Sequence, residues 1–421
     1  MKKVLSLLVA IALLIPMAFS AMAAETRPFD GETIRVIFGN HDWTTATKDL
    51  LAQFTEKTGI TIVSESYPED QLNQKITVEL ASGGRNLDVF MTRPLQETKL
   101  FIKNGWLMDL APLFEDAEYD ILDFIPSALG IFQNEGVTFG VPLVTEREVM
   151  YYRKDLLEAA GIAVPTTFEE LEAAAAALND PANGVYGFVA RGLSAAAVTQ
   201  FSSFLYGFGG NFDVDGVAAI DTPEAIAAFE YYGGLLRKYG PPGALNMHWQ
   251  QAAGVYSQGQ AAFCTDADSI WKSFSGPDTA VFDVTGYAPV PGGKPYNVCS
   301  WGFSIPAGSQ KAGPAMEFIK WATSKEMIAF AQAAGISSSR QSVWADPDSI
   351  KNYPAELSAA IAASNPIGVS NDRPLVVQVG KARDIIGAVI VTAIEGGDVA
   401  AAARTANAAY QAIIDEDFGG K

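Results

Sequence analysis

The stretch TIRVIFGNHDWTTATKDLLAQFTEKTGITIVSES, residues 33–66, contains the pattern that decides the fold. Its first residues, up to Phe38, are rich in β-branched side chains and predict a strand. The next segment has apolar residues at helical spacing and stops at Gly59, which predicts a helix, and residues 60–66 predict a second strand. A strand–helix–strand unit of this kind is typical of a parallel sheet, so the sequence predicts an α/β fold.

The tetrapeptide Gly39-Asn40-His41-Asp42 inside this stretch also occurs in metal-dependent phosphoesterases. Such enzymes hold two cations about 3.5–4 Å apart, which takes many His and Asp ligands from several loops. The whole chain has only two histidines, His41 and His248, and almost nothing but an apolar leader precedes the tetrapeptide. The sequence therefore argues against a metallophosphoesterase, and we expect neither a metal site nor a cofactor.

The loop after the first strand suits a different ligand. In open α/β sheets, ligands bind beyond the carboxyl ends of the strands, and Asn40, His41, Asp42 and Trp43 stand there. Planar polar groups give paired hydrogen bonds to vicinal hydroxyls, and an indole covers the apolar face of a sugar. We expect these residues to contact a polyhydroxylated ligand. The alternative is structural, with Asp42 capping the helix and Trp43 packing at its foot.

The N-terminus predicts export. Two lysines precede an apolar run and the small-residue site Ala21-Met22-Ala23, so we interpret residues 1–23 as a secretory signal peptide cleaved near Ala23. The apolar run is shorter than the about 20 residues that a membrane span needs. We therefore expect a soluble, monomeric protein in the periplasm.

The charge of the chain excludes some classes of partner. The formal net charge is −19, and removal of Lys2 and Lys3 with the leader makes it −21. So acidic a surface argues against nucleic acid and anionic lipid as partners. The roughly 400 residues that remain after the leader are enough for two lobes, each with its own core.

The chain contains two cysteines, Cys264 and Cys299. Export permits a disulfide between them. Both lie in strand-like runs, AAFCTD and YNVCSW, so two buried thiols are an equally good interpretation. The sequence leaves this choice open.

Further segments follow the opening stretch in a recognisable order. They include DVFMTRP from Asp88, FIKNGWLMDLAPLF from Phe101, FGVPLVTEREVMYYRKDLL from Phe139 and YSQGQAAFCTD from Tyr256. Together with LLAQFTEKTGITI from Leu50, this series covers nearly the whole mature chain. It resembles the extracellular solute-binding proteins of ABC importers, the family 1 carbohydrate-binding type of the maltose-binding protein class.

This resemblance implies a type II periplasmic binding protein fold. Two lobes, each a mostly parallel sheet flanked by helices, would enclose a ligand cleft. The N-terminal lobe would hold residues 24–140 and 288–335, and the C-terminal lobe residues 141–287 and 336–421. The Pro/Gly-rich junctions GVPLV and GYAPVPGG would be the crossings between them. The family also implies a membrane permease as partner and no catalysis.

Strand ends in this layout supply further candidates for ligand contact. Arg93 follows DVFMT, and its guanidinium is able to donate to two ligand oxygens. Glu146 and Arg147 follow the first crossing, and Asp266 follows AAFCT, where the family places ligand contacts. For Arg93, Glu146 and Arg147 the alternative is an ion pair, at the surface, between the lobes or at the hinge.

Aromatic and C-terminal residues complete the predicted site. Trp249 and Trp271 are candidates for stacking on a ligand, with core packing as the alternative. Trp301 and Gly302 match a position that the family uses, where the glycine lets backbone approach the ligand. Arg340, in SSSRQSVW, lies at the return to the second lobe.

The expected function is the capture of a sugar or sugar alcohol for import. The segment SSSRQSVW resembles that of sorbitol- and mannitol-type binders, which favours a polyol. One rival is a secreted hydrolase, in which Glu146 and Asp266 would form the carboxylate pair of a glycosidase. Another rival is a carrier of the same fold for a glycerol phosphodiester, iron or thiamine.

Overall fold

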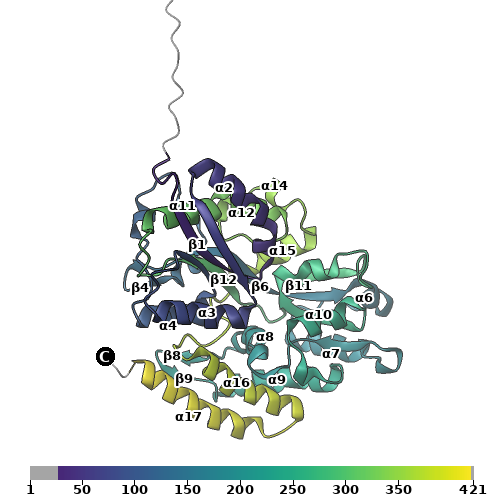
Figure 1. Cartoon of the computed structure of the whole chain (residues 1–421). Coiled ribbons are helices and arrows are strands. Elements are labelled where there is room, and N and C mark those ends of the chain that lie inside the picture. Colours follow the sequence, from purple (N-terminus) through teal and green to yellow (C-terminus); the bar gives the residue numbers. More distant parts are fainter. Residues whose placement is uncertain (1–26, 419–421) are drawn as a thin grey trace, which may run out of the picture.

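The structure is a computed structural model that describes residues 27–418 and shows two lobes (Figure 1). One eight-stranded sheet runs through both lobes in the order β2-β1-β3-β12-β6-β10-β7, and β11 also pairs with β6. The signal peptide predicted for residues 1–23 lies outside the described residues. In the described part of the chain, no helix is long and apolar enough to cross a membrane.

The first lobe is built on the predicted strand–helix–strand unit. β1 (Thr33–Gly39) pairs in parallel with β2 (Thr61–Tyr67) and β3 (Val89–Thr92). Gly59 ends the intervening helix with a φ of 76°, as a glycine stop requires. β12 (Asn297–Ser304) returns antiparallel beside β3, so this half of the sheet is mixed.

The strand β6 (Val141–Arg153) joins the two lobes. From Val141 to Arg147 it pairs with β12 of the first lobe. Beyond that point it pairs with β10 (Ala261–Ala267) and β11 (Thr285–Pro289) of the second lobe. Because one uninterrupted strand belongs to both halves of the sheet, its middle residues form the floor between the lobes.

The remaining strands lie in the second lobe and at the periphery. β7 (Tyr186–Val189) pairs in parallel with β10 and forms the far edge of the sheet. Two short hairpins lie outside the main sheet: β4 (Gln133–Asn134) with β5 (Val137–Thr138), and β8 (Asp213–Val214) with β9 (Val217–Ala218). The second hairpin turns at Asp215-Gly216, where both residues have a positive φ.

Helices flank the sheet in both lobes (Figure 1). Those before β6 or returning to the first lobe are α1 (Asp42–Thr47), η1 (Lys48–Leu50), α2 (Leu51–Thr58), α3 (Glu69–Ala81), the π-helix η2 (Pro94–Thr98), α4 (Lys99–Lys103), η3 (Ala111–Phe114), η4 (Ile121–Asp123), α5 (Pro126–Gly130), α11 (Ala312–Ala322), α12 (Lys325–Ala333), α13 (Gln341–Trp344) and α14 (Pro347–Ile350). Those of the second lobe are α6 (Lys154–Ala160), α7 (Phe168–Leu178), η5 (Pro181–Asn183), α8 (Ser194–Gly207), α9 (Pro223–Tyr239), η6 (Ala244–Asn246), α10 (Trp249–Ser257), η7 (Asp268–Phe274), α15 (Ala355–Ser364), α16 (Val379–Glu395) and α17 (Val399–Phe418).

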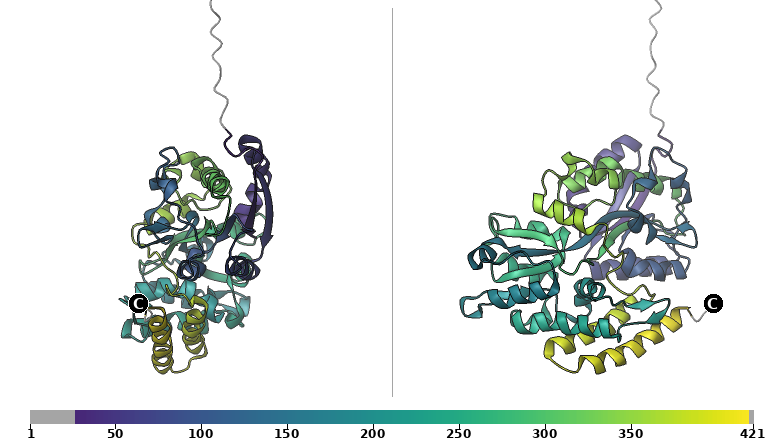
Figure 2. Two further views of the ribbon diagram at one scale, coloured as in Figure 1. Left: turned by 60° about the vertical axis from the view of Figure 1, so that its left-hand side comes forward. Right: turned by 180° about the vertical axis from the view of Figure 1, so that it is seen from behind.

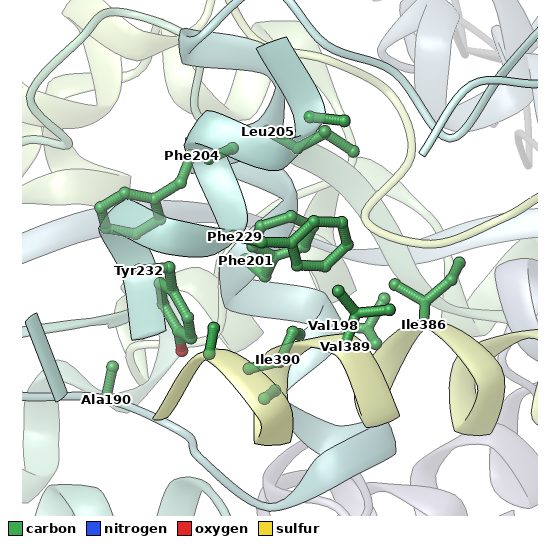
Figure 3. Packing of buried hydrophobic residues seen from close by; sticks show 14 of the residues in the cluster. Ala190, Val198, Phe201, Phe204, Leu205, Phe229, Tyr232, Ile386, Val389 and Ile390 are labelled. Carbon is green, nitrogen blue, oxygen red and sulfur yellow. The ribbon is translucent and has the colours of Figure 1, made fainter. Parts of the chain in front are cut away.

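Each lobe has its own aromatic-rich core. In the first lobe Trp43 packs against Phe38 and Phe303, with ring centroids 6.1 and 5.4 Å apart. In the second lobe α8, α9 and α16 pack together, and Phe201 stacks on Phe229 at 4.2 Å (Figure 3). The long helix α17 lies beside α16 at the far end of this lobe (Figure 2). Separate cores let the lobes move as rigid bodies about the strands that join them.

The division into residues 24–140 with 288–335 and 141–287 with 336–421 stays a prediction, and the packing refines it. Ile336 and Val343, which follow the predicted boundary, lie in the core of the first lobe. Leu357 and Ile361 of α15 pack with Tyr151 of the second lobe. In the proposed division, the last crossing therefore lies after α14 rather than at residue 336.

The two cysteines are buried free thiols. Cys264 lies opposite Tyr151 on β6, whereas Cys299 lies opposite Thr145. Six residues of strand at about 3.3 Å each place the two cysteines roughly 20 Å apart. A disulfide needs Cα atoms within about 7 Å, so the structure excludes the bridge that the sequence left open.

A substitution at Gly302 tests how tightly β12 packs on β6. A Cβ at this position would lie 2.2 Å from Cζ of Phe132 and 2.5 Å from the carbonyl oxygen of Val141. We expect Gly302→Ala to lower the Tm by roughly 1–4 °C, because a clash with a backbone atom is not relieved by a rotamer change. Gly234→Ala in α9 is the control, since its Cβ would meet nothing within 4 Å. A Gly302→Ala variant as stable as the wild type in differential scanning calorimetry would contradict this packing.

Candidate functional site

A cleft of about 300 Å3 lies between the lobes. Its walls come from the loops after β1 and β3, from the middle of β6, from β12 and from the start of η7, α10 and α16. Among the residues predicted from the sequence, those that line it are Asn40, His41, Asp42, Arg93, Glu146, Trp249 and Trp301. Their contact with a ligand stays a prediction.

The loop after β1 forms one wall of the cleft. Asn40 and Asp42 are exposed there, and His41 is the N-cap of α1, where its Nδ1 accepts a hydrogen bond from the backbone N–H of Trp43 at 3.0 Å. Burial lowers the pKa of His41, which keeps the imidazole neutral at physiological pH. The centroid of the imidazole ring lies 5.3 Å from the centroid of the Trp301 ring.

Trp43 corrects one prediction from the sequence. Its side chain is fully buried in the core of the first lobe rather than open to the cleft. Trp43 is the second residue of α1, on the helix face that packs on the first-lobe core, whereas the neighbouring Asp42 is exposed. The structural alternative, that Trp43 packs at the foot of the helix, is the correct one.

Arg93 lies at the cleft and forms the ion pairs given as its alternative role, and its contact with a ligand stays a prediction. It lines the cleft, and its guanidinium also pairs with Glu97 at 2.9 Å and with Glu69 at 2.8 Å. The guanidinium carbon lies 5.9 Å from the centre of the Trp301 ring. These contacts fix the guanidinium in place, which favours directed hydrogen bonds to a ligand.

Asp266 is buried behind the cleft wall instead of lining it. Its Oδ1 accepts from Arg191 Nη2 at 2.6 Å and from Gln200 Nε2 at 3.1 Å. Arg191 itself lines the cleft, so the carboxylate acts by orienting this arginine. The sequence reasoning missed Arg191, although it follows β7 as Arg93 follows β3, and the strand-end rule would have found it.

Glu146 occupies the cleft floor where β6 passes between the lobes. Ser269 Oγ of η7 donates a hydrogen bond to its Oε1 at 2.9 Å. Burial and the nearby carboxylate of Asp268 raise the pKa of Glu146 to about 7. The carboxyl therefore carries its proton in a substantial part of the molecules at neutral pH, so it is able to donate as well as accept.

Arg147 and Trp271 are not part of the cleft. Arg147 points away from it and is fully buried, with Nη1 3.3 Å from Asp268 Oδ2 and Nε donating to Asn365 Oδ1 at 2.8 Å. Successive residues of a strand face opposite sides, so Glu146 and Arg147 cannot both face the ligand. Trp271 packs on Tyr353 at 5.5 Å in the second lobe. For both residues the structural alternative is the correct one.

Gly302 and Arg340 also lie outside the cleft. Gly302 faces the ring of Phe132 on the first-lobe side of β12, so it serves packing rather than backbone approach to a ligand. Arg340 is fully buried and donates to the carbonyl oxygens of Thr323 and Tyr119 at 2.8 and 3.1 Å. Its guanidinium ties together loops of the first lobe.

Several polar residues of the cleft carried no signal that the sequence analysis used. Besides Arg191 they are Glu69, Gln96, Thr199, His248, Lys272, Asp372, Arg373 and Arg383. Most belong to helices or to the irregular segment before α16, so they do not follow a strand and the strand-end rule does not predict them. His248, which caps α10, places the neighbouring Trp249 at the cleft.

The charges around the cleft are largely paired within the protein. The ion pairs are Arg93 with Glu97, Arg191 with Asp266 and Arg373 with Asp372. Glu146 and Asp266 do not form an open pair of carboxylates, because Asp266 is buried and bound to Arg191. Among the residues that the structure describes, no three or more His, Cys, Asp and Glu side chains are placed to hold a metal ion.

A family model described as bacterial extracellular solute-binding protein matches residues 40–329. The chain belongs to this family. The cleft described above is thus the interlobe cleft of a solute-binding protein, and the fold predicted by resemblance is confirmed by neighbours among solved structures.

Two curated relatives of this solute-binding protein carry polyol names. A mannitol-binding protein of Pseudomonas aeruginosa is 31% identical over 269 residues, which are 61% of each chain. An erythritol/L-threitol-binding protein of Mycolicibacterium smegmatis is 29% identical over 351 residues, which are 76% of this chain and 73% of the relative. The chain thus spans about three fifths of the length of the first relative and nearly three quarters of the second.

Two solved structures share the fold over almost their whole length. A solute-binding protein of Agrobacterium radiobacter in complex with ribitol has a TM-score of 0.80 and 28% identity, with 91% of this chain and 99% of that chain covered. A solute-binding protein of Agrobacterium vitis with bound D-mannitol has a TM-score of 0.77 and 25% identity, with the same coverage.

The raised pKa of Glu146 predicts a pH-dependent contribution to stability. The folded state holds this proton more tightly than the unfolded chain, whose pKa is near 4.5, so the contribution is present below pH 4.5 and is lost as the pH rises through about 7. Glu146→Gln does not ionise. We expect it to match the wild type near pH 4.5 and to be more stable at pH 8, by roughly 1–3 kcal/mol after allowance for partial exposure.

Unfolding in urea at both pH values measures this difference. The exposed Glu158→Gln in α6 is the matched control and should leave the pH dependence unchanged. A Glu146→Gln variant that differs from the wild type by the same amount at both pH values would show that folding does not raise the pKa of Glu146.

Proposed function

We propose that this protein is the periplasmic binding component of an ABC importer and that it binds an acyclic sugar alcohol between its lobes. The observation that carries the proposal is the pairing of cleft charges: of the four arginines that line the cleft, Arg93, Arg191 and Arg373 each have their own carboxylate, so their donors are fixed. A site whose charges are largely paired within the protein, with many directed donors and acceptors, suits a neutral ligand rich in hydroxyls.

The aromatic surface of the cleft favours an open-chain ligand over a ring. A pyranose presents flat C–H faces that stack on indole rings. Trp301 is only 5% exposed and lies against His41 and Arg93, and Trp43 and Trp271 are buried in cores. Trp249 is the remaining partly exposed indole at the cleft. An acyclic polyol needs hydrogen bonds along its length and little stacking.

The size of the cleft also favours a small acyclic polyol. Its volume of about 300 Å3 lies at the lower end of the roughly 300–1,000 Å3 of ligand sites in proteins. The mannitol, erythritol and ribitol in the names of the relatives and neighbours are acyclic polyols of this modest size. These names support the proposal, and the largely paired charges at the cleft of this chain give it a physical basis.

Export belongs to the proposal. The family is extracellular by its description, and the leader at residues 1–23 carries the charge, apolar run and small-residue site of a signal peptide. Intact-mass analysis of protein recovered from the periplasm would test the cleavage near Ala23. A protein that remains full-length in the cytoplasm would contradict the location. Delivery to a membrane permease, as a monomer and without chemistry, follows the family pattern.

Thermal shift with a ligand panel tests the substrate class. D-Mannitol, ribitol or erythritol at about 100 times its Kd would stabilise the folded state by about 2.7 kcal/mol, and we expect the Tm to rise by roughly 3 °C. Maltose, glycerol 3-phosphate and glycerophosphocholine should give no shift. A shift with maltose alone would contradict the acyclic ligand, and no shift with any polyol or sugar would contradict the function.

Asn40→Ala supplies the matched mutation. Asn40 is exposed at the cleft, so its loss should weaken polyol binding about tenfold, the value of one buried hydrogen bond, and leave the Tm of the free protein nearly unchanged. The exposed Asn86→Ala is the control and should bind as the wild type does. Isothermal titration calorimetry with the polyol that gives the largest shift measures both variants. If Asn40→Ala and Asn86→Ala bound the polyol with equal affinity, the Asn40 loop would not be part of the binding site.

A further inference from the structure

Gln96 of η2 reaches across the cleft from the first lobe to the second. Its Oε1 accepts hydrogen bonds from Arg373 Nη1 at 3.0 Å and from Arg383 Nη1 at 3.4 Å. Gln96 is partly buried and lines the cleft together with both arginines. One amide oxygen of the first lobe therefore lies between two cations of the second lobe.

The two arginines lie side by side. Besides Gln96 they share a second acceptor, because Thr199 Oγ1 accepts from Arg373 Nη2 at 3.4 Å and from Arg383 Nη2 at 3.2 Å. Two guanidinium groups that bond the same two oxygens must be close neighbours, and like charges at such a distance repel. The acceptors that they share are both neutral.

One carboxylate serves this pair. Asp372 bonds Arg373 through both of its oxygens, at 2.6 and 2.5 Å. Among the described residues, Arg383 has no carboxylate within ion-pair distance, and its Nε is buried without a hydrogen-bond partner. Burial and the charge of Arg373 lower the pKa of Arg383, although an arginine stays charged at neutral pH. The pair thus carries surplus positive charge, and it faces Gln96.

The other arginines of the cleft form stronger hydrogen bonds than those between Gln96 and its two arginines. Arg93 and Arg191 are each bonded by a carboxylate, Glu97 and Asp266. Such charge-assisted bonds are roughly twice as strong as those to a neutral amide. Both of these pairs lie within one lobe, where a strong bond stabilises the fold and does not oppose opening.

Other contacts between the lobes lie nearer the surface. Lys99 Nζ donates to the carbonyl oxygen of Leu375, and Lys103 lies 3.7 Å from Asp417 with half of its side chain exposed. Exposed pairs of this kind contribute little and are screened by salt. Lys272 Nζ of η7, an exposed residue of the cleft, donates to the carbonyl oxygen of Ala334 in the first lobe. Gln96 is the partly buried contact inside the cleft, where closure removes water and strengthens polar interactions.

We propose that Gln96 is a positioning residue that acts as a weak latch and sets how long the two lobes stay closed. A neutral amide against two guanidinium groups holds the closed form only together with the contacts that a ligand adds. A carboxylate at the same position would form charge-assisted bonds to both arginines and hold the lobes closed without a ligand. The effect on ligand release rests on the proposed function, whereas the effect on closure does not.

Small-angle X-ray scattering of ligand-free protein tests the latch directly. We expect Gln96→Glu to have a smaller radius of gyration than the wild type, because the new carboxylate stabilises the closed form. Gln53→Glu, an exposed position in α2, adds the same charge away from the cleft and should leave the radius unchanged. Adding Arg383→Met to Gln96→Glu should return the radius toward that of the wild type. Equal radii for Gln96→Glu and the wild type would overturn the proposal.

Stopped-flow fluorescence measures the consequence for release, with D-mannitol and ribitol as probes. We expect Gln96→Glu to slow dissociation about tenfold and Gln96→Ala to accelerate it, since the closed state gains or loses bonds that the open state never makes. Dissociation that is faster in Gln96→Glu than in the wild type would contradict the latch. If neither probe binds any variant, the proposed ligand class fails, and the scattering result still decides the latch.

Discussion

The continuity of β6 is the constraint on which the arrangement depends. Its first half is held by β12 and its second half by β10 and β11, so the chain cannot change the relation of the lobes without bending this strand. Glu146 lies at the point where the partners change, and the neighbouring Arg147 is anchored by Asp268 and Asn365. The cleft floor is therefore rigid in position, while the walls on either side move with their lobes.

The two walls of the cleft contribute different polar side chains. The first lobe offers an exposed loop and Arg93, and the second lobe offers Arg191 and the pair Arg373 and Arg383. Most of these side chains are fixed by partners inside their own lobe, so they meet a ligand already oriented and lose little conformational freedom. The contact through Gln96 is the exception, because its partners belong to the opposite lobe. Binding and closure are coupled at this residue.

Local signals in the sequence predicted elements well and side-chain direction poorly. The structure contains the capping box of Thr167 and Glu170 and the cap and proline at Thr222 and Pro223. Such features can be read from sequence because each depends on neighbours a few residues away. The buried positions of Trp43, Trp271 and Arg340 depend on which distant elements pack against them. Arg373 lies in an irregular segment and Arg383 in a helix, so no strand pattern in the sequence predicts that they reach the cleft.

Scattering during titration with the polyol that binds most tightly tests the central claim most directly, because the account requires two rigid lobes to close on a neutral ligand. The radius of gyration should fall as the polyol saturates the protein and should return when the polyol is dialysed away. An unchanged radius at saturation, with calorimetry showing the polyol bound, would mean that the ligand binds without closure, and this account of the cleft would be wrong.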